Sequence, residues 1–152
     1  MSAPPYLALR DVGQVRLEVV GPDPGAADSA EGSVPNNASL VLLAEVRGVR
    51  LLLTGDAEPP AQAFLARTLA GLHVDVLKVP HHGSRYQDLD LLCGLAADVA
   101  VVSVGADNDY GHPSPGLVAA LDACGTDVWR TDRDGEVVVA PGDDGLEVRT
   151  SR

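Results

Sequence analysis

The chain has 152 residues, enough for one domain with a buried core, and 45% of them are hydrophobic while 3% are aromatic. Its formal net charge of −11 argues against a surface that coats nucleic acid, which would be basic. The negative net charge does not exclude a small site for a nucleic-acid substrate, because bound divalent metals supply local positive charge. No apolar run approaches the roughly 18 residues that span a bilayer, and Met1–Pro5 has neither the basic nor the apolar region of a signal peptide. We therefore expect no membrane insertion by this chain.

The N-terminal part predicts strands around one long loop. Residues 15–19 alternate apolar with polar side chains, which is typical of a half-buried strand. Residues 21–37 are rich in Pro, Gly, Asp and Ser, and a loop of this length is either functional or disordered. The apolar runs 39–46 and 49–54 are joined by Arg-Gly and predict a β-hairpin with a tight turn.

From Asp56 onward, helical and strand-like segments alternate. Asp56 could serve as the N-cap of the first helix, whose first turn tolerates the two prolines that follow. The predicted elements are a helix to about residue 72, a strand at 74–79, a short helix at 89–95, a strand at 99–104, a helix at 115–124, and strands at 128–131, 136–140 and 146–149. This order predicts an α/β fold in which helices pack on a mixed sheet.

The two cysteines, Cys93 and Cys124, are far apart in sequence and show no paired motif. We interpret them as buried free thiols, so that they leave the redox compartment open.

Residues with metal-ligand chemistry follow two of the apolar runs. Asp56 comes after 51–53, and His81 and His82 come after 74–79. Strand ends meet at a common sheet edge in α/β proteins, so a carboxylate and an imidazole could share one divalent metal there. Asp56 taken alone favours a helix cap, and it is the nearby histidine pair that favours the ligand interpretation. Adjacent strand residues point to opposite sides, so one histidine could bind metal while the other contacts substrate or orients a ligand.

Other polar residues also have two interpretations. Ser84 could cap the next segment or donate to a phosphate oxygen. His112, in the Asn108–Ser114 loop, belongs either to a turn before a helix or to a substrate-contacting or proton-transferring site. Asn37 is either a turn residue or part of the site, at the mouth of the hairpin.

The ligand set is incomplete. A hydrolytic metal site needs at least three protein ligands and an open position for water, and a two-metal site needs more. The sequence contains no H-x-H, H-E-x-x-H or C-x-x-C motif.

Taken in order, the motifs over about residues 34–140 resemble the C-terminal part of the metallo-β-lactamase-fold domain of ComEC-type competence proteins. These motifs are Asn37-x-Ser39, Thr54-Gly55-Asp56, Asp75 to Ser84 with its Pro-His-His-Gly-Ser end, Val101 to Gly105, Asn108-x-Tyr-Gly-His-Pro113, and Arg130-Thr-Asp-x-x-Gly135. The resemblance implies an αββα sandwich, of which this chain is the C-terminal half. Residues 1–33, a strand and the Pro/Gly-rich loop, would precede the partial domain at 34–152.

The resemblance also implies a two-metal hydrolase with Zn²⁺ or Mn²⁺. Asp56 would be the carboxylate that bridges two metals, and His82 would be a further ligand. The other roles would be catalytic for His81 and His112, and substrate-binding for Ser84, Asn108 and Asn37. The family's main motif, His-x-His-x-Asp-His, belongs upstream of this region and is missing from the chain, and no histidine stands near Asn37, where a third motif falls. We therefore expect a two-metal site only in the intact domain and an inactive isolated chain.

ComEC-type proteins form the membrane channel for DNA entry in natural transformation. The resemblance implies that this chain is a fragment of their nuclease or phosphodiesterase domain, soluble and extracytoplasmic, with DNA as substrate and the transmembrane channel as partner. Two alternatives are a lactamase-fold hydrolase of another small ester and a non-catalytic accessory domain of a membrane transport protein.

Overall fold

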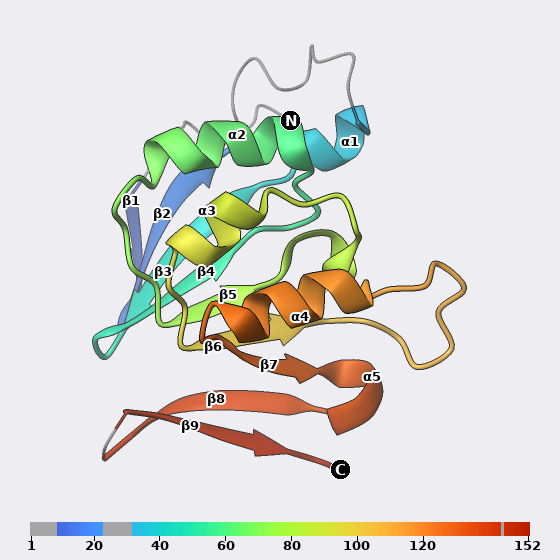
Figure 1. The fold of residues 1–152 in the computed structure, drawn as a ribbon. Coiled ribbons are helices and arrows are strands. Elements are labelled where there is room, and N and C mark those ends of the chain that lie inside the picture. The colour runs from blue at the N-terminus through green and yellow to red at the C-terminus, as the bar shows by residue number, and fades with distance from the viewer. Residues whose placement is uncertain (1–8, 23–31, 144) are drawn as a thin grey trace.

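The structure of the chain, a computed structural model, describes residues 9–22, 32–143 and 145–152. Its main feature is a seven-stranded sheet with the strands in sequence order (Figure 1). The strands are β1 Leu9–Val12, β2 Val15–Gly21, β3 Val41–Val46, β4 Val49–Leu53, β5 Val76–Lys78, β6 Val99–Val102 and β7 Asp127–Arg130. Strands β1 to β4 pair antiparallel and β4 to β7 pair parallel, so the predicted mixed sheet is confirmed.

The predicted hairpin is β3 and β4, joined by a two-residue turn. Arg47 has φ 52° and Gly48 has φ 81°. Two central residues with positive φ are what a turn needs to match the twist of the flanking strands. The turn thereby fixes the register in which Leu43 lies opposite Leu52.

Three helices cover one face of the sheet. They are α2 Pro59–Thr68, α3 Leu89–Gly94 and α4 Pro115–Ala123. Helix α2 lies over the antiparallel part, at β2. Because β4 to β7 step through the sheet in one direction, right-handed crossovers place all three helices on the same side, as Figure 1 shows. Their apolar faces and the facing strand residues form the core: Leu52, Leu65, Leu77, Leu92, Leu95, Ala100, Val102, Leu117 and Leu121.

The opposite face of the sheet is also apolar. Leu51, Val76, Val99 and Val101 alternate with the core residues and therefore point away from the three helices. The structure thus contains one helix layer and one sheet layer, which is the arrangement expected for half of an αββα sandwich.

The helix after β4, α2, begins later than predicted. Its N-cap is Glu58 and its first residues are Pro59 and Pro60, so the assignment of Asp56 as the cap is wrong. Prolines suit a first turn because its N–H groups have no partner within the helix. Asp56 lies two residues earlier, in the turn after β4, where its N–H donates to Ser39 Oγ at 3.0 Å.

Several short elements went unpredicted. Within the expected loop at 21–37 the structure has a helix, α1 Val34–Asn37, and residues 23–31 of that loop lie outside the described residues. Strand β1 was also missed, as were the 3₁₀ turn η2 Pro80–Gly83 and the short helix α5 Thr131–Asp134. The last two predicted strands form a separate hairpin, β8 Val137–Gly142 with β9 Gly145–Thr150.

The interpretation of the cysteines as buried free thiols is wrong. Cys93 in α3 and Cys124 at the end of α4 form a disulfide, with Cα atoms 5.6 Å apart, and Cys124 is exposed. The 31-residue separation hid this pairing, which arises because α3 and α4 pack side by side. Among the described residues, no helix has the length and hydropathy required to cross a bilayer.

Candidate active site

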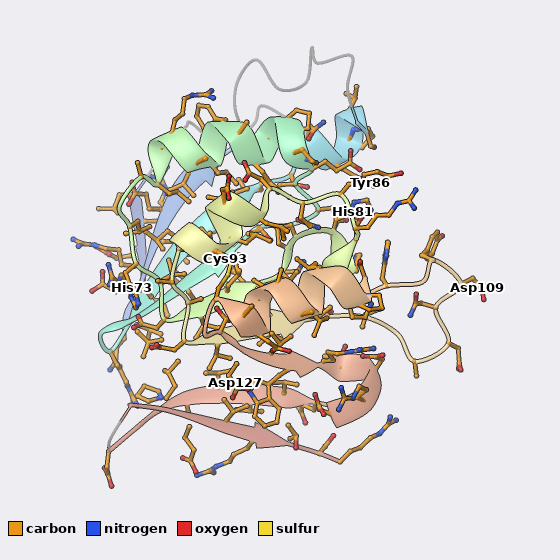
Figure 2. All side chains as sticks on the ribbon, in the orientation of Figure 1. His73, His81, Tyr86, Cys93, Asp109 and Asp127 are labelled. Carbon is orange, nitrogen blue, oxygen red and sulfur yellow. A yellow bond between two sulfur atoms is a disulfide. The ribbon has the colours of Figure 1, made fainter. Side chains whose placement is uncertain are left out.

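The polar residues singled out from the sequence gather at one edge of the sheet. Asp56 follows β4, His81 and His82 follow β5, and the loop with His112 follows β6, so all lie at the carboxyl ends of parallel strands. Figure 2 shows His81 on the same side of the molecule as the loop that carries Asp109, whereas His73 lies at the opposite side.

Asp56 and His82 form the centre of this edge. His82 Nε2 lies 3.4 Å from Asp56 Oδ1, and His82 Nδ1 lies 2.7 Å from the carbonyl oxygen of Ser103. Because a carbonyl only accepts, Nδ1 carries the hydrogen, and in the neutral ring the lone pair of Nε2 faces the carboxylate. A metal-binding histidine has this arrangement, in which a hydrogen bond at one nitrogen fixes the other for the metal.

The donor pair fits a divalent metal in spacing and chemistry. Two ligands that each lie about 2.1 Å from a tetrahedral Zn²⁺ are about 3.4 Å apart. The side chains of Asp56 and His82 are 40% and 46% exposed, so both remain accessible. The described part of the chain, however, contains no group of three or more His, Cys, Asp and Glu side chains arranged to hold a metal. By themselves these two residues would be an incomplete ligand set, and their role as metal ligands stays a prediction.

His81 points to a different carboxylate. Its Nδ1 lies 3.3 Å from Glu58 Oε1, without the alignment of a hydrogen bond, and it is buried. Glu58 is itself only 12% exposed and accepts from Ser33 N–H at 2.6 Å and Asn36 Nδ2 at 2.8 Å. Sequence analysis missed Glu58, although its position two residues after Asp56 in the same turn was an available signal.

The backbone of the Pro-His-His-Gly segment separates the two rings. His81, His82 and Gly83 have φ values of 44°, 53° and 80°. Non-glycine residues rarely adopt this left-handed conformation, and consecutive examples occur where the surrounding structure enforces them, often at functional sites. The expectation that the two histidines point to different sides is met, through this turn rather than through strand alternation.

His112 is presented by a closed loop. The Asn108 amide donates to the carbonyl oxygens of His112 at 2.9 Å and Gly105 at 3.0 Å, and accepts from His112 N–H at 3.1 Å. The side chain of Asn108 therefore shapes the loop. The His112 ring centroid lies 5.7 Å from that of His81. Burial, and then the nearby His81 and His82, lower the pKa of His112 below its usual range.

Ser84 and Asn37 are buried beside the site. Ser84 Oγ accepts from Tyr86 N–H at 3.3 Å. Asn37 Oδ1 accepts from Ala61 N–H at 3.4 Å, so it supports the first turn of α2. For both residues, substrate contact stays a prediction.

Lys78 is a second residue that sequence analysis missed. Its Nζ donates to the carbonyl oxygens of Gly55 at 3.0 Å and Val79 at 3.2 Å. Burial lowers the pKa of Lys78, and the negative charge of Asp56 acts in the opposite direction. Lys78 thus ties the turn that carries Asp56 to the strand that leads to the histidines.

Two hollows open beside His112. One has a volume of about 440 Å³ and is lined by Ser84, Arg85, Tyr86, Tyr110, Gly111, His112, Ser114 and Pro115. The other, of about 210 Å³, is lined by His82, Val104, Gly105, Asn108, Tyr110 and His112. The larger volume is within the range of ligand sites, and together the hollows connect the surface with both His82 and His112.

Comparison with known proteins shows to which family the chain is related. No protein-family model matches the chain. It is 32% identical over 132 residues to ComE operon protein 3 of Bacillus subtilis, a match that covers 86% of this chain and 16% of that protein. It is 36% identical over 118 residues to Recombination protein 2 of Haemophilus influenzae, covering 77% of this chain and 15% of that protein. The chain is homologous to a segment of the ComEC-type competence proteins.

A solved structure supports the fold of this ComEC-type segment. A chain from Parabacteroides distasonis that carries the name of a metal-dependent hydrolase superposes with a TM-score of 0.50 and is 16% identical. The superposition covers 84% of this chain and 56% of that one. At this identity the likeness concerns the fold, and it agrees with a partial lactamase-like sandwich.

Proposed function

We propose that the chain is part of a metal-dependent phosphodiesterase that cleaves DNA in a DNA-uptake protein. The observation that carries the proposal is the Asp56–His82 pair, in which the Ser103 carbonyl fixes the Nδ1–H tautomer and leaves Nε2 facing a carboxylate. The homology to ComEC-type proteins supports DNA as the substrate. The two-metal site and the activity would depend on further ligands from outside the described residues, whereas Asp56 and His82 alone would hold one metal weakly.

The residues of the site have distinct roles in this proposal. Asp56 and His82 would hold the divalent metal, Zn²⁺ or Mn²⁺, which when bound supplies positive charge against the charge that develops on phosphate. His112 has a lowered pKa and is neutral near pH 7, so its ring can accept a proton. His81, with Glu58 beside Nδ1, keeps Nε2 available toward the leaving oxygen.

We further propose that the domain works outside the cytoplasm, next to the transmembrane channel of its parent. The Cys93–Cys124 disulfide supports this location, because disulfides form and persist in oxidising compartments.

Metal binding to the purified chain is the first test. Calorimetric titration of Mn²⁺ and Zn²⁺ is expected to show micromolar binding that is lost in both Asp56→Ala and His82→Ala. His73→Ala and Asp98→Ala are matched controls and should bind as the original chain does. Both residues are exposed; His73 lies at the opposite side of the molecule, and Asp98 directly precedes β6, at the amino end of that strand. Binding that survives in Asp56→Ala and His82→Ala would contradict the assignment of the ligands.

The second test uses the parent protein, in which the upstream segment is present. Metal-dependent cleavage of a labelled DNA strand should fall at least about a hundredfold in Asp56→Ala and in His82→Ala, because metal ligands contribute several kcal/mol of transition-state stabilisation. The His73→Ala parent should cleave at the normal rate.

A second candidate function is a non-catalytic accessory domain. It is favoured by the presence of only two aligned donors among the described residues. Unchanged DNA cleavage in the parent with Asp56→Ala would support this candidate.

A further inference from the structure

Two of the few aromatic residues of this chain line the candidate site. The sequence has one Phe, one Trp and three Tyr. Tyr86 and Tyr110 both line the 440 Å³ hollow, and their side chains are 58% and 84% exposed. Such large apolar rings are normally buried, and a pair of exposed rings along one cleft indicates a surface that contacts a ligand.

Tyr110 stands between the two hollows beside His112. Its ring centroid is 6.0 Å from that of His112, and the two planes are inclined by only 20°. Tyr110 lines both the hollow that reaches His82 and the hollow that reaches Ser84. A flat group that stacks on Tyr110 would therefore lie directly beside the His112 and His82 rings.

Tyr86 provides a second ring, with a positive charge attached. The Arg85 guanidinium lies 4.8 Å from the centroid of the Tyr86 ring and donates to the Tyr86 hydroxyl at 2.6 Å. Figure 2 shows Tyr86 and His81 on the same side of the molecule. In a chain of net charge −11, this cation marks one place where an anionic ligand is favoured.

We propose that Tyr110 and Tyr86 stack on bases of an unpaired DNA strand, while Arg85 contacts its backbone phosphate. Exposed aromatic rings beside a cation are how proteins bind single strands without sequence preference, since every base has a flat face. In a duplex the base faces are covered by their neighbours, so the arrangement selects unpaired strands. This inference rests on the proposed function, which supplies DNA as the ligand. It adds that the bound DNA is unpaired and names the residues that recognise it.

The test compares two labelled 12-mers of equal charge, oligo(dT) and an abasic strand, by fluorescence anisotropy with the complete chain at low ionic strength. We expect oligo(dT) to bind at least about fivefold more tightly than the abasic strand, given the strength of base–aromatic stacking. Tyr110→Ala should weaken oligo(dT) binding by a similar factor and leave the abasic strand unchanged. Tyr110→Phe, which keeps the ring, should bind normally.

Val138→Ala is the control for loss of an exposed apolar side chain, because Val138 lies in β8, outside both hollows. Equal binding of the two strands, no binding of oligo(dT), or full affinity in Tyr110→Ala would each overturn the inference. The proposed function fails separately: if Asp56→Ala leaves cleavage by the parent intact while the base-dependent binding persists, stacking stands without the assigned metal site.

Discussion

Position 83 can hold only glycine if the two histidines are to keep their directions. Gly83 has φ 80°, and a Cβ there would come within 2.5 Å of Pro113 Cβ. We expect Gly83→Ala to lower the free energy of unfolding by about 2 kcal/mol or more, because left-handed strain and the clash act together. Urea denaturation measures this loss.

Gly71→Ala separates the two effects. Gly71 has φ 75° but nothing within 4 Å of its added Cβ, so only the conformational strain remains, about 1 kcal/mol. Equal losses in the two variants would show that the Pro113 contact does not matter.

The lowered pKa of His112 predicts how the stability of the fold depends on pH. Its unfolded pKa is about 6.5, and its folded pKa is lower because of burial and of His81 and His82. Below the unfolded value, the unfolded chain binds more protons, so stability decreases as the pH falls from about 6.5 toward the folded pKa. Above the unfolded pKa, His112 is neutral in both states and does not change the stability.

Proton NMR titration of the metal-free chain measures the His112 pKa directly. In His81→Ala the pKa should move up toward its usual value, because one of the causes is removed. In His112→Gln the denaturation midpoint should depend less steeply on pH between about 7 and 5. A His112 pKa that does not change in His81→Ala would contradict the geometry.

At the residue scale, what the sequence could predict depended on local signals. The places of Asp56, His82 and His112 at one sheet edge were predictable, because a polar residue after an apolar run marks a strand end. Glu58 was not found, because its role comes from contacts with Ser33 and Asn36 across the chain. The exposure of Tyr110 likewise left no trace in spacing or composition.

At the scale of elements, the disulfide joins two helices that surround the site loop. The bond between Cys93 and Cys124 closes a segment that contains β6 and the His112 loop. In the chain-entropy view, a loop of this length is worth about 3–4 kcal/mol of stability. The Cys93→Ser/Cys124→Ser double variant should lose that amount in urea denaturation.

A reducing agent provides the control for this prediction. It should lower the melting temperature of the original chain to that of the double variant and leave the double variant unaffected. No response of the original chain to reduction would mean that the two thiols are not paired.

Elements were predictable where periodicity or turn chemistry was strong. The hairpin and the helices α3 and α4 were located from apolar spacing and from an Arg-Gly turn. The start of α2 was placed too early, because Asp-Ala-Glu-Pro-Pro offers two acidic caps and only the prolines decide between them. α1 is a single turn, too short for a periodic signal. The pairing of α3 with α4, and so the disulfide, is a tertiary contact that no local pattern contains.

At the scale of the whole molecule, the sheet has two apolar faces, and the three crossover helices cover only one of them. Strands with continuous apolar runs are typical of sheets buried on both sides. Leu51 and Val101 point to the face away from the helices and are part-buried, whereas Val76 and Val99 on the same face are buried. Because part-exposed apolar side chains favour association, we expect the isolated chain to self-associate through the part of this face around Leu51 and Val101 as its concentration rises.

Sedimentation equilibrium tests this expectation. Leu51→Lys places a charge on the face and should shift the chain toward monomer, because burying an unpaired charge in an interface is costly. Ala63→Lys makes the same change in charge at an exposed position of α2 and should associate like the original chain. A compact monomer at all concentrations of the original chain would show that this face is stable in water, and the half-sandwich would then need no second layer to cover it.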